Sequence, residues 1–332
     1  MTDDTSQDPV ESAAPAATVQ APPPAPAGKA PQETPGSLLC AARALADLSL
    51  DELAGQTKLA RATLEALERD DFAALLAPTH ERAAAGWLGG FDFPFGLPRV
   101  FVDALVAHGL PEAAPKAGQP ACDALVRALH AHCTDRQGFQ ALIDGWGTQW
   151  GAGTRPDKLP HRAADLAMPG TQSTSPLQTR YVPVGKMYFE GLHRLVMADV
   201  ALPGLRQPDG DHGAEALGTR LAFEAYPGLL ATEVLGKRSY KSDDKARQDP
   251  DRLMARLTLI DALEQGRTRL GLRLKLSPAQ RDHLASDAKG DRLDAVLCLL
   301  QAGWADLQRE AGDPRCGLPP GMDPVEGWIL TA

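Results

Sequence analysis

Residues 86–99 read GWLGGFDFPFGLPR, a short apolar strand that ends at a carboxylate and is followed at once by a turn rich in proline and glycine. Residues 221–228, LAFEAYPG, repeat this arrangement: an apolar run, then Glu224, then a Pro-Gly turn. Helical patterns lie between and after these two runs. Short strands that alternate with helices are typical of the α/β class.

The other periodic segments of this region predict helices at residues 100–108, 122–132, 186–200, 251–264 and 291–308. A further helix is expected to begin at Ser277-Pro278, because serine is a good N-cap and proline suits the first helical position. Residues 146–180 are rich in Gly, Pro, Ser and Thr and predict a long loop. A loop of that length in a compact domain is usually functional or mobile.

Three carboxylates stand where a site would form. Asp92 directly follows the first apolar run, and Glu224 ends the second. Asp294 lies three residues after Asp291, on one face of the last helix, which is otherwise largely apolar. Ligands of open α/β sheets bind beyond the carboxyl ends of the strands. We therefore expect Asp92, Glu224 and Asp294 to converge at one edge of the sheet.

Such a set of carboxylates suits divalent cations. Mg²⁺ prefers hard oxygen ligands, and carboxylates bind Mn²⁺ as well. Two such ions, placed close together, activate a water molecule and stabilise the leaving oxygen in the cleavage of phosphodiesters. The spacing of the carboxylates is by itself weak evidence, since an acidic residue is more often a solvated or capping group.

The N-terminal part of the chain differs from the rest. Residues 1–35 are rich in Pro and Ala, have few large apolar residues, and carry five acidic residues against one lysine. This composition predicts a disordered tail, because little surface is available for burial. Residues 36–78 predict three short helices, the second opened by a capping box of Ser49 and Glu52. A helix, a tight turn and a helix form the helix-turn-helix pattern.

Residues 49–78, SLDELAGQTKLARATLEALERDDFAALLAP, closely resemble the helix-turn-helix of the RodZ-like family, within the wider Xre class. That resemblance implies a protein partner rather than the reading of bases. In the Xre class the third helix enters the major groove of DNA. Here its exposed side would carry Arg61 and Arg69 among four acidic residues, which repel phosphate.

Residues 85–332 resemble the bacterial domain-of-unknown-function family 429, described as a predicted RNase H-fold nuclease. The matching stretches occur in the order of that family: GWLGGFDFPFGLPR (86–99), KLPHRAADLAMPG (158–170), LAFEAYPGLLA (221–231), GKRSYKSDD (236–244), GDRLDAVLCLLQAGWA (290–305) and DPVEGWIL (323–330). The resemblance implies an RNase H-like mixed sheet with flanking helices. It also implies Asp92, Glu224 and Asp294 as catalytic metal ligands for Mg²⁺ or Mn²⁺, and Lys241, His161 and Arg162 as substrate-binding residues.

One departure from that family leaves the activity undecided. The family opens with a strand of the type G-x-D-F-S-S, whose Asp is the expected first metal ligand. We find no such strand in this chain, so the first strand of the domain is expected to be missing. Its place is taken by the helix-turn-helix. Three alternatives follow: a metal-dependent nuclease or phosphodiesterase acting on nucleic acid, a non-catalytic scaffold that binds a protein partner through residues 36–78, or a DNA-binding regulator.

The charge of the chain bears on nucleic-acid binding, and its cysteines and N-terminus bear on its location in the cell. The net charge of −9 comes mostly from the first 78 residues, and the remainder is close to neutral. The chain therefore lacks the excess of basic residues that tight, nonspecific binding of nucleic acid requires.

The five cysteines are scattered, which is typical of free thiols in a reducing compartment. The acidic start MTDDTSQDPV does not resemble a signal peptide, and no apolar run is long enough for a membrane span. We expect a cytoplasmic protein.

Overall fold

The computed structural model describes residues 49, 51–52, 76, 86–151, 153, 157–167, 173–207 and 220–332. The predicted tail at residues 1–35 lies outside these residues, as does nearly all of the predicted helix-turn-helix at 36–78. The predicted capping box is confirmed within that segment. The backbone N–H of Glu52 donates to Ser49 Oγ at 3.2 Å, and the N–H of Ser49 donates to Glu52 Oε2 at 2.8 Å.

The described residues form a mixed α/β structure, which confirms the predicted class. Its strands are β1 (Trp87–Phe91) and β2 (Arg220–Glu224). Its α-helices are α6 (Arg99–Ala104), α7 (Ala121–His132), α8 (Arg136–Gly145), α9 (Ala163–Leu166), α10 (Val184–Met197), α11 (Pro227–Leu235), α12 (Pro250–Glu264), α13 (Pro278–Ser286) and α14 (Asp291–Glu310).

Most predicted helices lie within a few residues of the observed bounds. The helix expected at 100–108 is α6, which continues as a π-helical turn over Leu105–Gly109. The predicted start of α13 is confirmed, since Ser277 Oγ accepts from the N–H of Gln280 at 3.2 Å. The long segment at 146–180 is less uniform than predicted, because it contains the short helix α9.

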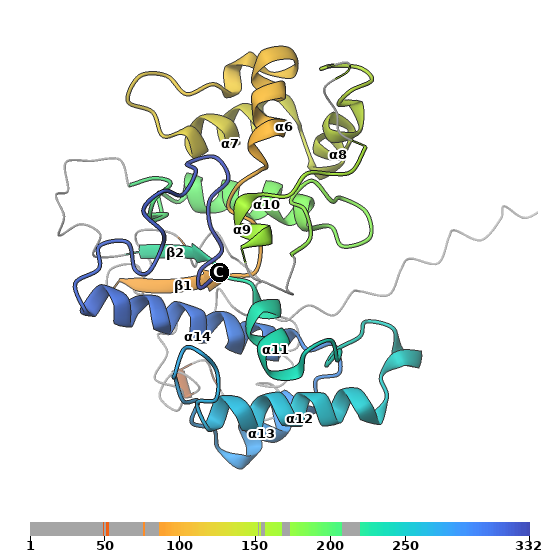
Figure 1. Cartoon of the computed structure of the whole chain (residues 1–332), viewed down its shortest axis with the longest axis vertical. Coiled ribbons are helices and arrows are strands. Elements are labelled where there is room, and N and C mark those ends of the chain that lie inside the picture. Colours follow the sequence, from red (N-terminus) through yellow and green to blue (C-terminus); the bar gives the residue numbers. More distant parts are fainter. Residues whose placement is uncertain are drawn as a thin grey trace, which may run out of the picture.

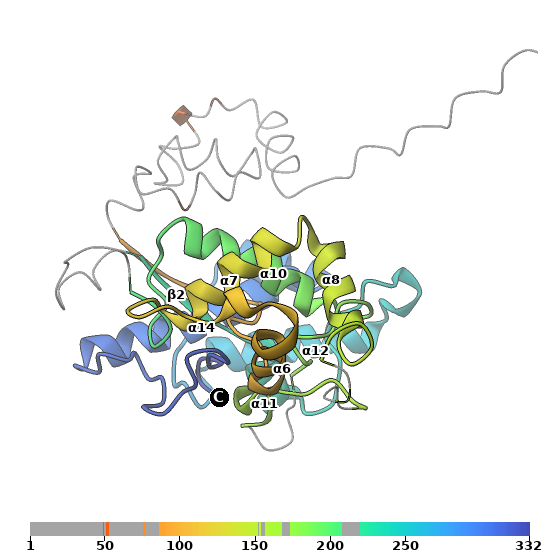
Figure 2. The same ribbon diagram turned by 90° about the horizontal axis from the view of Figure 1, so that it is seen from above.

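The two strands are parallel and in register from Trp87 opposite Arg220 to Phe91 opposite Glu224. Figure 1 shows the sheet between two layers: α6, α7, α8 and α10 lie on one side, and α14 covers the other, with α11, α12 and α13 beyond it. Seen from above in Figure 2, α7 and α10 run next to each other. The described sheet has two strands, so the RNase H-like class remains a proposal.

Packing of β1 on α14 requires a residue without a side chain. A Cβ atom at Gly90 would lie 2.6 Å from the carbonyl oxygen of Cys298 in α14. Such a contact is far closer than van der Waals radii allow, so glycine permits the helix to lie directly on the strand. The close approach brings the N-terminal turn of α14, and with it Asp294, toward the end of β1.

Two large apolar clusters stabilise the layers. One joins α6, α7, α8 and α10 above the sheet and includes Phe101, Phe139 and Trp146. The other joins α11 to α14 below it and includes Leu259 and Leu297. Each fully buried side chain of this size stabilises the fold by roughly 1.5–3 kcal/mol. The clusters therefore fix the helices on both sides of the strand ends.

No helix among the described residues combines the length and apolar character that crossing a bilayer requires. The four cysteines in the described part of the chain are buried free thiols: Cys122, Cys133, Cys298 and Cys316.

Helices α7 and α10 are joined by a stack of rings. The ring of His130 lies between those of Phe189 and His193, with centroid distances of 3.8 Å and 3.6 Å. His130 Nε2 hydrogen-bonds the carbonyl oxygen of Phe189 at 2.7 Å. Burial lowers the pKa of His130. Burial is also the largest cause that lowers the pKa of His193, to about 4. The nearby positive charges of His130, Arg194 and Arg127 lower it as well, and Glu190 acts in the opposite direction.

We expect this stack to make stability depend on pH. The folded chain keeps His193 neutral down to a pH of about 4, whereas the unfolded chain takes up the proton near 6.5. Between those values the unfolded state binds more protons, so the free energy of unfolding decreases as the pH falls from 7 toward 4. Urea denaturation at pH 7 and pH 5 measures this decrease. His193→Phe, which retains a stacked ring, should reduce it, and His108→Gln, at an exposed histidine, should not. Equal pH dependence in both variants would contradict the assignment.

Candidate functional site

The parallel register places the ends of both strands at the same edge of the sheet. Because Phe91 lies opposite Glu224, Asp92 follows β1 at the edge where Glu224 ends β2. The C-terminal segment closes over this edge: the N–H of Leu330 donates to the backbone carbonyl of Glu224 at 2.8 Å. Figure 1 shows the C-terminus at the tips of the two strands.

Glu224 is buried and fully engaged by neighbouring groups. Arg162 donates from Nη2 to Oε1 at 2.5 Å and from Nη1 to Oε2 at 2.7 Å. The backbone N–H of Phe95 donates to Oε2 at 2.8 Å. Both carboxylate oxygens of Glu224 therefore accept hydrogen bonds from the chain itself. This bidentate geometry is the strongest that an arginine and a carboxylate form.

Arg162 pairs with a second buried carboxylate as well. It donates from Nη2 to Asp165 Oδ1 at 2.8 Å, and Asp165 in turn accepts from Ser173 Oγ at 2.6 Å. Burial opposes the charge of Arg162, but Glu224 and Asp165 outweigh burial and raise the pKa of the guanidinium. Arg162 also donates to the carbonyl of Glu326 at 2.9 Å, so one side chain ties α9, β2 and the C-terminal segment together.

Asp294 is held by two donors from the segment after α11. The hydroxyl of Tyr240 donates to Oδ1, and the amine of Lys241 donates to Oδ2. Tyr240 is buried, whereas the amine-bearing side chain of Lys241 is partly open to solvent. Burial alone would lower the pKa of Lys241, but Asp294 and Asp92 outweigh it and raise that pKa. The amine is therefore a fixed positive charge next to both aspartates.

Asp92 differs from the other two carboxylates because its side chain is exposed. Neighbouring protein atoms still reduce its hydration, and this desolvation, together with the charge of Asp294, raises the pKa of Asp92 to about 6. Lys241 acts in the opposite direction. Asp92 and Asp294 thus form a pair of neighbouring carboxylates with one lysine as their shared countercharge.

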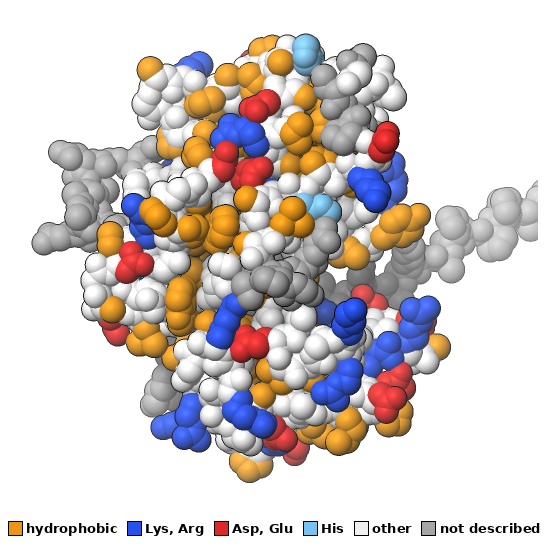
Figure 3. Space-filling view, in the orientation of Figure 1, with side chains coloured by type: hydrophobic (Ala, Val, Ile, Leu, Met, Phe, Trp, Pro, Cys, Tyr) orange, Lys and Arg blue, Asp and Glu red, His pale blue; other side chains and the backbone are white. Residues whose placement is uncertain are grey.

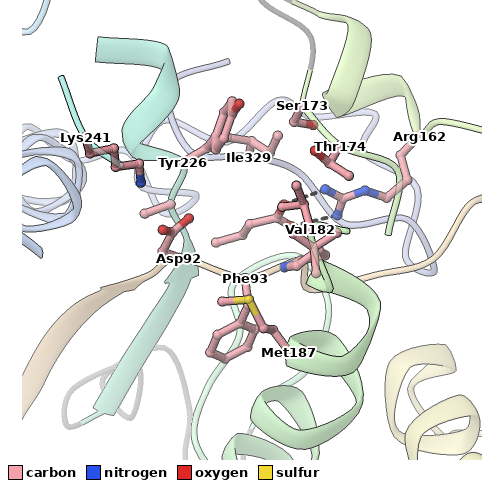
Figure 4. A pocket seen from close by; sticks show the side chains of 14 residues that line it. Asp92, Phe93, Arg162, Ser173, Thr174, Val182, Met187, Tyr226, Lys241 and Ile329 are labelled. Carbon is pink, nitrogen blue, oxygen red and sulfur yellow. Dashed lines mark hydrogen bonds and ion pairs between the residues drawn. The ribbon is translucent and has the colours of Figure 1, made fainter. Parts of the chain in front are cut away.

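Asp92, Glu224, Arg162 and Lys241 line a cavity of about 270 Å³. Its polar lining comes from Asp92, Arg162, Ser173, Thr174, Tyr226, Glu224 and Lys241. Its apolar lining includes Phe93, Val182, Val184, Met187 and Ile329. Figure 4 shows Lys241 and Asp92 on one side of the cavity, Ser173 and Thr174 on the opposite side, and Phe93 with Met187 between them along one wall.

The predicted site residues are therefore brought together unequally. The cavity is lined by Asp92, Glu224, Lys241 and Arg162. Asp294 does not line it but forms an ion pair with Lys241. His161 is half-buried and is not part of the cavity lining. Within the described part of the chain, no three His, Cys, Asp or Glu side chains are grouped so that they could hold a metal ion.

Sequence reasoning missed several residues that shape the site. Tyr240 stands beside Lys241 in the sequence and could have been noticed as a potential partner for Asp294. Asp165 is three residues after Arg162, the N-cap of α9, and side chains at the N-cap and N3 positions of a helix lie next to each other. Phe93, Val182 and Met187 gave no such signal, because an apolar residue in a loop or helix is usually a core residue.

Comparison with known proteins identifies one part of the chain. Residues 38–84 match the model of a family described as a helix-turn-helix domain. No curated protein and no solved structure matches the chain. The match confirms the predicted helix-turn-helix and does not extend to residues 85–332. It includes Leu76, which is buried in the upper apolar cluster and whose carbonyl accepts from Arg220 at 2.8 Å.

We expect Arg162 to be the residue whose removal destabilises this region most. Arg162→Met leaves Glu224 and Asp165 buried without a countercharge and should lower the free energy of unfolding by roughly 3–5 kcal/mol. Arg180→Met provides a matched control, because Arg180 is exposed and pairs with exposed Asp144. Its loss should cost about 1 kcal/mol or less. Urea denaturation of both variants measures the difference, and similar losses would contradict the role assigned to Arg162.

Proposed function

We propose that the chain joins a helix-turn-helix binding module to a metal-dependent phosphodiesterase of the RNase H-like class. The single observation that supports hydrolysis is the position of Asp92, an exposed carboxylate at a strand end that lines a cavity beside Asp294. Lys241 is the countercharge that the two aspartates share. Because two carboxylates face one amine, this region has an excess of negative charge and favours the binding of a further cation.

The residues present fit a magnesium or manganese ion that takes few of its ligands from the protein. Mg²⁺ is usually bound by one or two carboxylates, with waters and substrate phosphate as its other ligands. Asp92 would hold the ion, and Asp294 would add negative charge nearby without being a ligand, because both of its oxygens accept hydrogen bonds from Tyr240 and Lys241. Glu224 would not be a ligand in this proposal, because both of its oxygens already accept hydrogen bonds from Arg162. When bound, the ion would supply positive charge to the phosphate and lower the pKa of a water molecule.

The chain's own residues have separate roles in this proposal. Lys241 carries a fixed positive charge at the cavity and would neutralise a phosphate oxygen of the substrate. Arg162 and Glu224 position the strand ends and the loop that carries Phe95. Apolar walls on one side of the cavity would exclude water from the phosphate and strengthen its contact with Lys241.

The RNase H-like class draws support from two features. The strands β1 and β2 are parallel, carry carboxylates at the same edge, and are covered by helices on both sides. In addition, Gly90–Phe93 reads G-F-D-F and meets the first four positions of the pattern G-x-D-F-S-S. In this proposal β1 is itself the opening strand, with Asp92 as the strand-end aspartate, which revises the expectation that this strand is missing.

A second candidate function is a non-catalytic binding protein. The observation that favours it is the pairing of two of the three carboxylates: Glu224 with Arg162, and Asp294 with Lys241 and Tyr240. In this alternative Lys241 is the resident cation of the site. The cavity would then bind a ligand without turnover, and the helix-turn-helix would bind the partner.

Hydrolysis of labelled single-stranded DNA or RNA in the presence of Mn²⁺ separates the two candidates. If the ion supplies several kcal/mol of charge stabilisation, Asp92→Asn should reduce the rate by roughly 100-fold. Asp103→Asn is the matched control, because Asp103 is an exposed aspartate on α6. Mn²⁺ should also raise the Tm of the unaltered chain and not that of Asp92→Asn. Absence of both effects would favour the binding protein.

The helix-turn-helix supports binding to nucleic acid or protein, and we propose a protein partner. The segment 36–78 carries seven acidic residues against four basic ones, and its expected third helix mixes Arg61 and Arg69 with acids. Contacts with phosphates require basic side chains and weaken steeply as salt increases.

We therefore expect the full chain to produce no salt-dependent shift of duplex DNA in a gel at 50–200 mM salt, a range over which phosphate-mediated binding changes by orders of magnitude (roughly 10³–10⁵-fold). A shift that weakens with salt and disappears in the double variant Arg61→Ala, Arg69→Ala would show instead that the module binds DNA. Asp51→Asn, at an exposed acidic residue, serves as the control variant.

A further inference from the structure

In the hydrolysis proposed above, the apolar half of the cavity serves only to exclude water. Val182 and Met187 are 53% and 41% exposed, although both are large apolar side chains that line the cavity. Exposed apolar side chains next to convergent polar groups are typical of a ligand-binding pocket. The wall that they form therefore requires an occupant that is itself apolar.

Phe93 gives this wall a preformed flat surface. Its ring packs against Phe95 with a centroid distance of 5.4 Å and against Phe91 at 5.8 Å. A Cβ atom at Gly191 of α10 would lie 2.6 Å from the Phe93 ring, so the helix contacts the ring directly and holds it in place. Figure 4 shows Met187 beside this ring, facing the same cavity. A ring fixed before binding loses little entropy when a planar group packs on it.

The wall opposite the charged groups can form hydrogen bonds. Ser173 is buried and donates its hydroxyl proton to Asp165 at 2.6 Å, so its oxygen retains lone pairs that can accept from a ligand N–H. Thr174 beside it adds a hydroxyl that both donates and accepts. The cavity thus has a charged end, where the amine of Lys241 lies near Asp92, an apolar floor, and a hydrogen-bonding end at Ser173 and Thr174.

We propose that this cavity binds one unpaired nucleotide: its phosphate at Lys241, and its base on Phe93, Val182 and Met187 with an edge toward Ser173 and Thr174. A nucleobase combines a planar apolar face with an edge of donors and acceptors, as this arrangement requires. This inference rests on the proposed function for the position of the phosphate.

The size and charge of the site favour a single nucleotide over a duplex. The cavity volume of about 270 Å³ lies just below the usual range for ligand pockets, roughly 300–1,000 Å³. A base paired in a duplex cannot enter such a pocket without leaving the stack. On the face shown in Figure 3, basic side chains are interspersed with acidic ones rather than arranged in a stripe that could follow a duplex backbone.

Calorimetric titration of the full chain in metal-free buffer tests the base-binding wall separately from catalysis. The probes are adenosine 5′-monophosphate and ribose 5-phosphate. Both carry the same phosphate, so its repulsion by Asp92 and Asp294 affects them alike, and the first has a base where the second has a hydroxyl. We expect the nucleotide to bind about tenfold more tightly than the sugar phosphate, since the base buries apolar surface. Equal affinities would overturn the inference.

Variants of the wall sharpen this test. Met187→Ala should weaken binding of the nucleotide by about fivefold and leave binding of the sugar phosphate unchanged. Val182→Asn, at an exposed loop position, provides a second variant with little risk to folding and should act in the same direction. Met254→Ala on α12 is the matched control, because Met254 is 58% exposed and does not line the cavity. An unchanged nucleotide affinity in both wall variants would overturn the inference.

The outcomes distinguish this inference from the proposed function. Selective binding of the nucleotide without Mn²⁺-dependent hydrolysis would support the base-binding wall and overturn the phosphodiesterase. Hydrolysis at equal rates with diesters that carry or lack a base would support the phosphodiesterase and overturn the wall. Absence of both nucleotide binding and hydrolysis would overturn both.

Discussion

The buried pair of Arg162 and Glu224 is the interaction on which the site depends. The guanidinium of Arg162 joins a short helix to the end of β2 and to the carbonyl of Glu326, and the carboxylate of Glu224 holds the loop at Phe95. An arginine is suited to this position because its planar group can satisfy several acceptors at once and remains charged when buried. The strand edge is consequently rigid, and the groups around it are positioned before any ligand binds.

That rigidity divides the three carboxylates into two kinds. Glu224 and Asp294 are each held by donors from the chain, and Asp92 is exposed to the cavity. A carboxylate whose oxygens accept hydrogen bonds from arginine stabilises the fold but has little capacity left for a ligand. The chemistry of the cavity therefore centres on Asp92, with Lys241 and Asp294 setting its electrostatic environment.

The proposed nuclease and the proposed scaffold differ in the cation that neutralises the negative charge of Asp92 and Asp294. In the first, a divalent ion joins Lys241 at the two aspartates. In the second, Lys241 alone balances them, and the cavity serves binding. The apolar wall of Phe93, Val182 and Met187 has the same role in both proposals, because it determines which ligand binds and takes no part in the chemical step. In either proposal, the helix-turn-helix at residues 38–84 would supply a second binding surface.

Much of the local structure was predictable, because it depends on residues close in the sequence. Hydrophobic periodicity located α7, α10, α12 and α14. Side-chain caps within three residues located the starts of the helices after Ser49 and Ser277. Carboxylates that directly follow apolar runs indicated the edge of the sheet at which the cavity lies.

The sequence alone determined the alternation of strands and helices, the capping of the helices and the presence of Asp92 and Glu224 at strand ends, since each follows from interactions over a few residues. Only the tertiary structure decided which carboxylate is open. Arg162 meets Glu224 across 62 residues, and Tyr240 meets Asp294 across 54. Such pairings depend on how helices pack on the sheet, and no local pattern of residues specifies that packing.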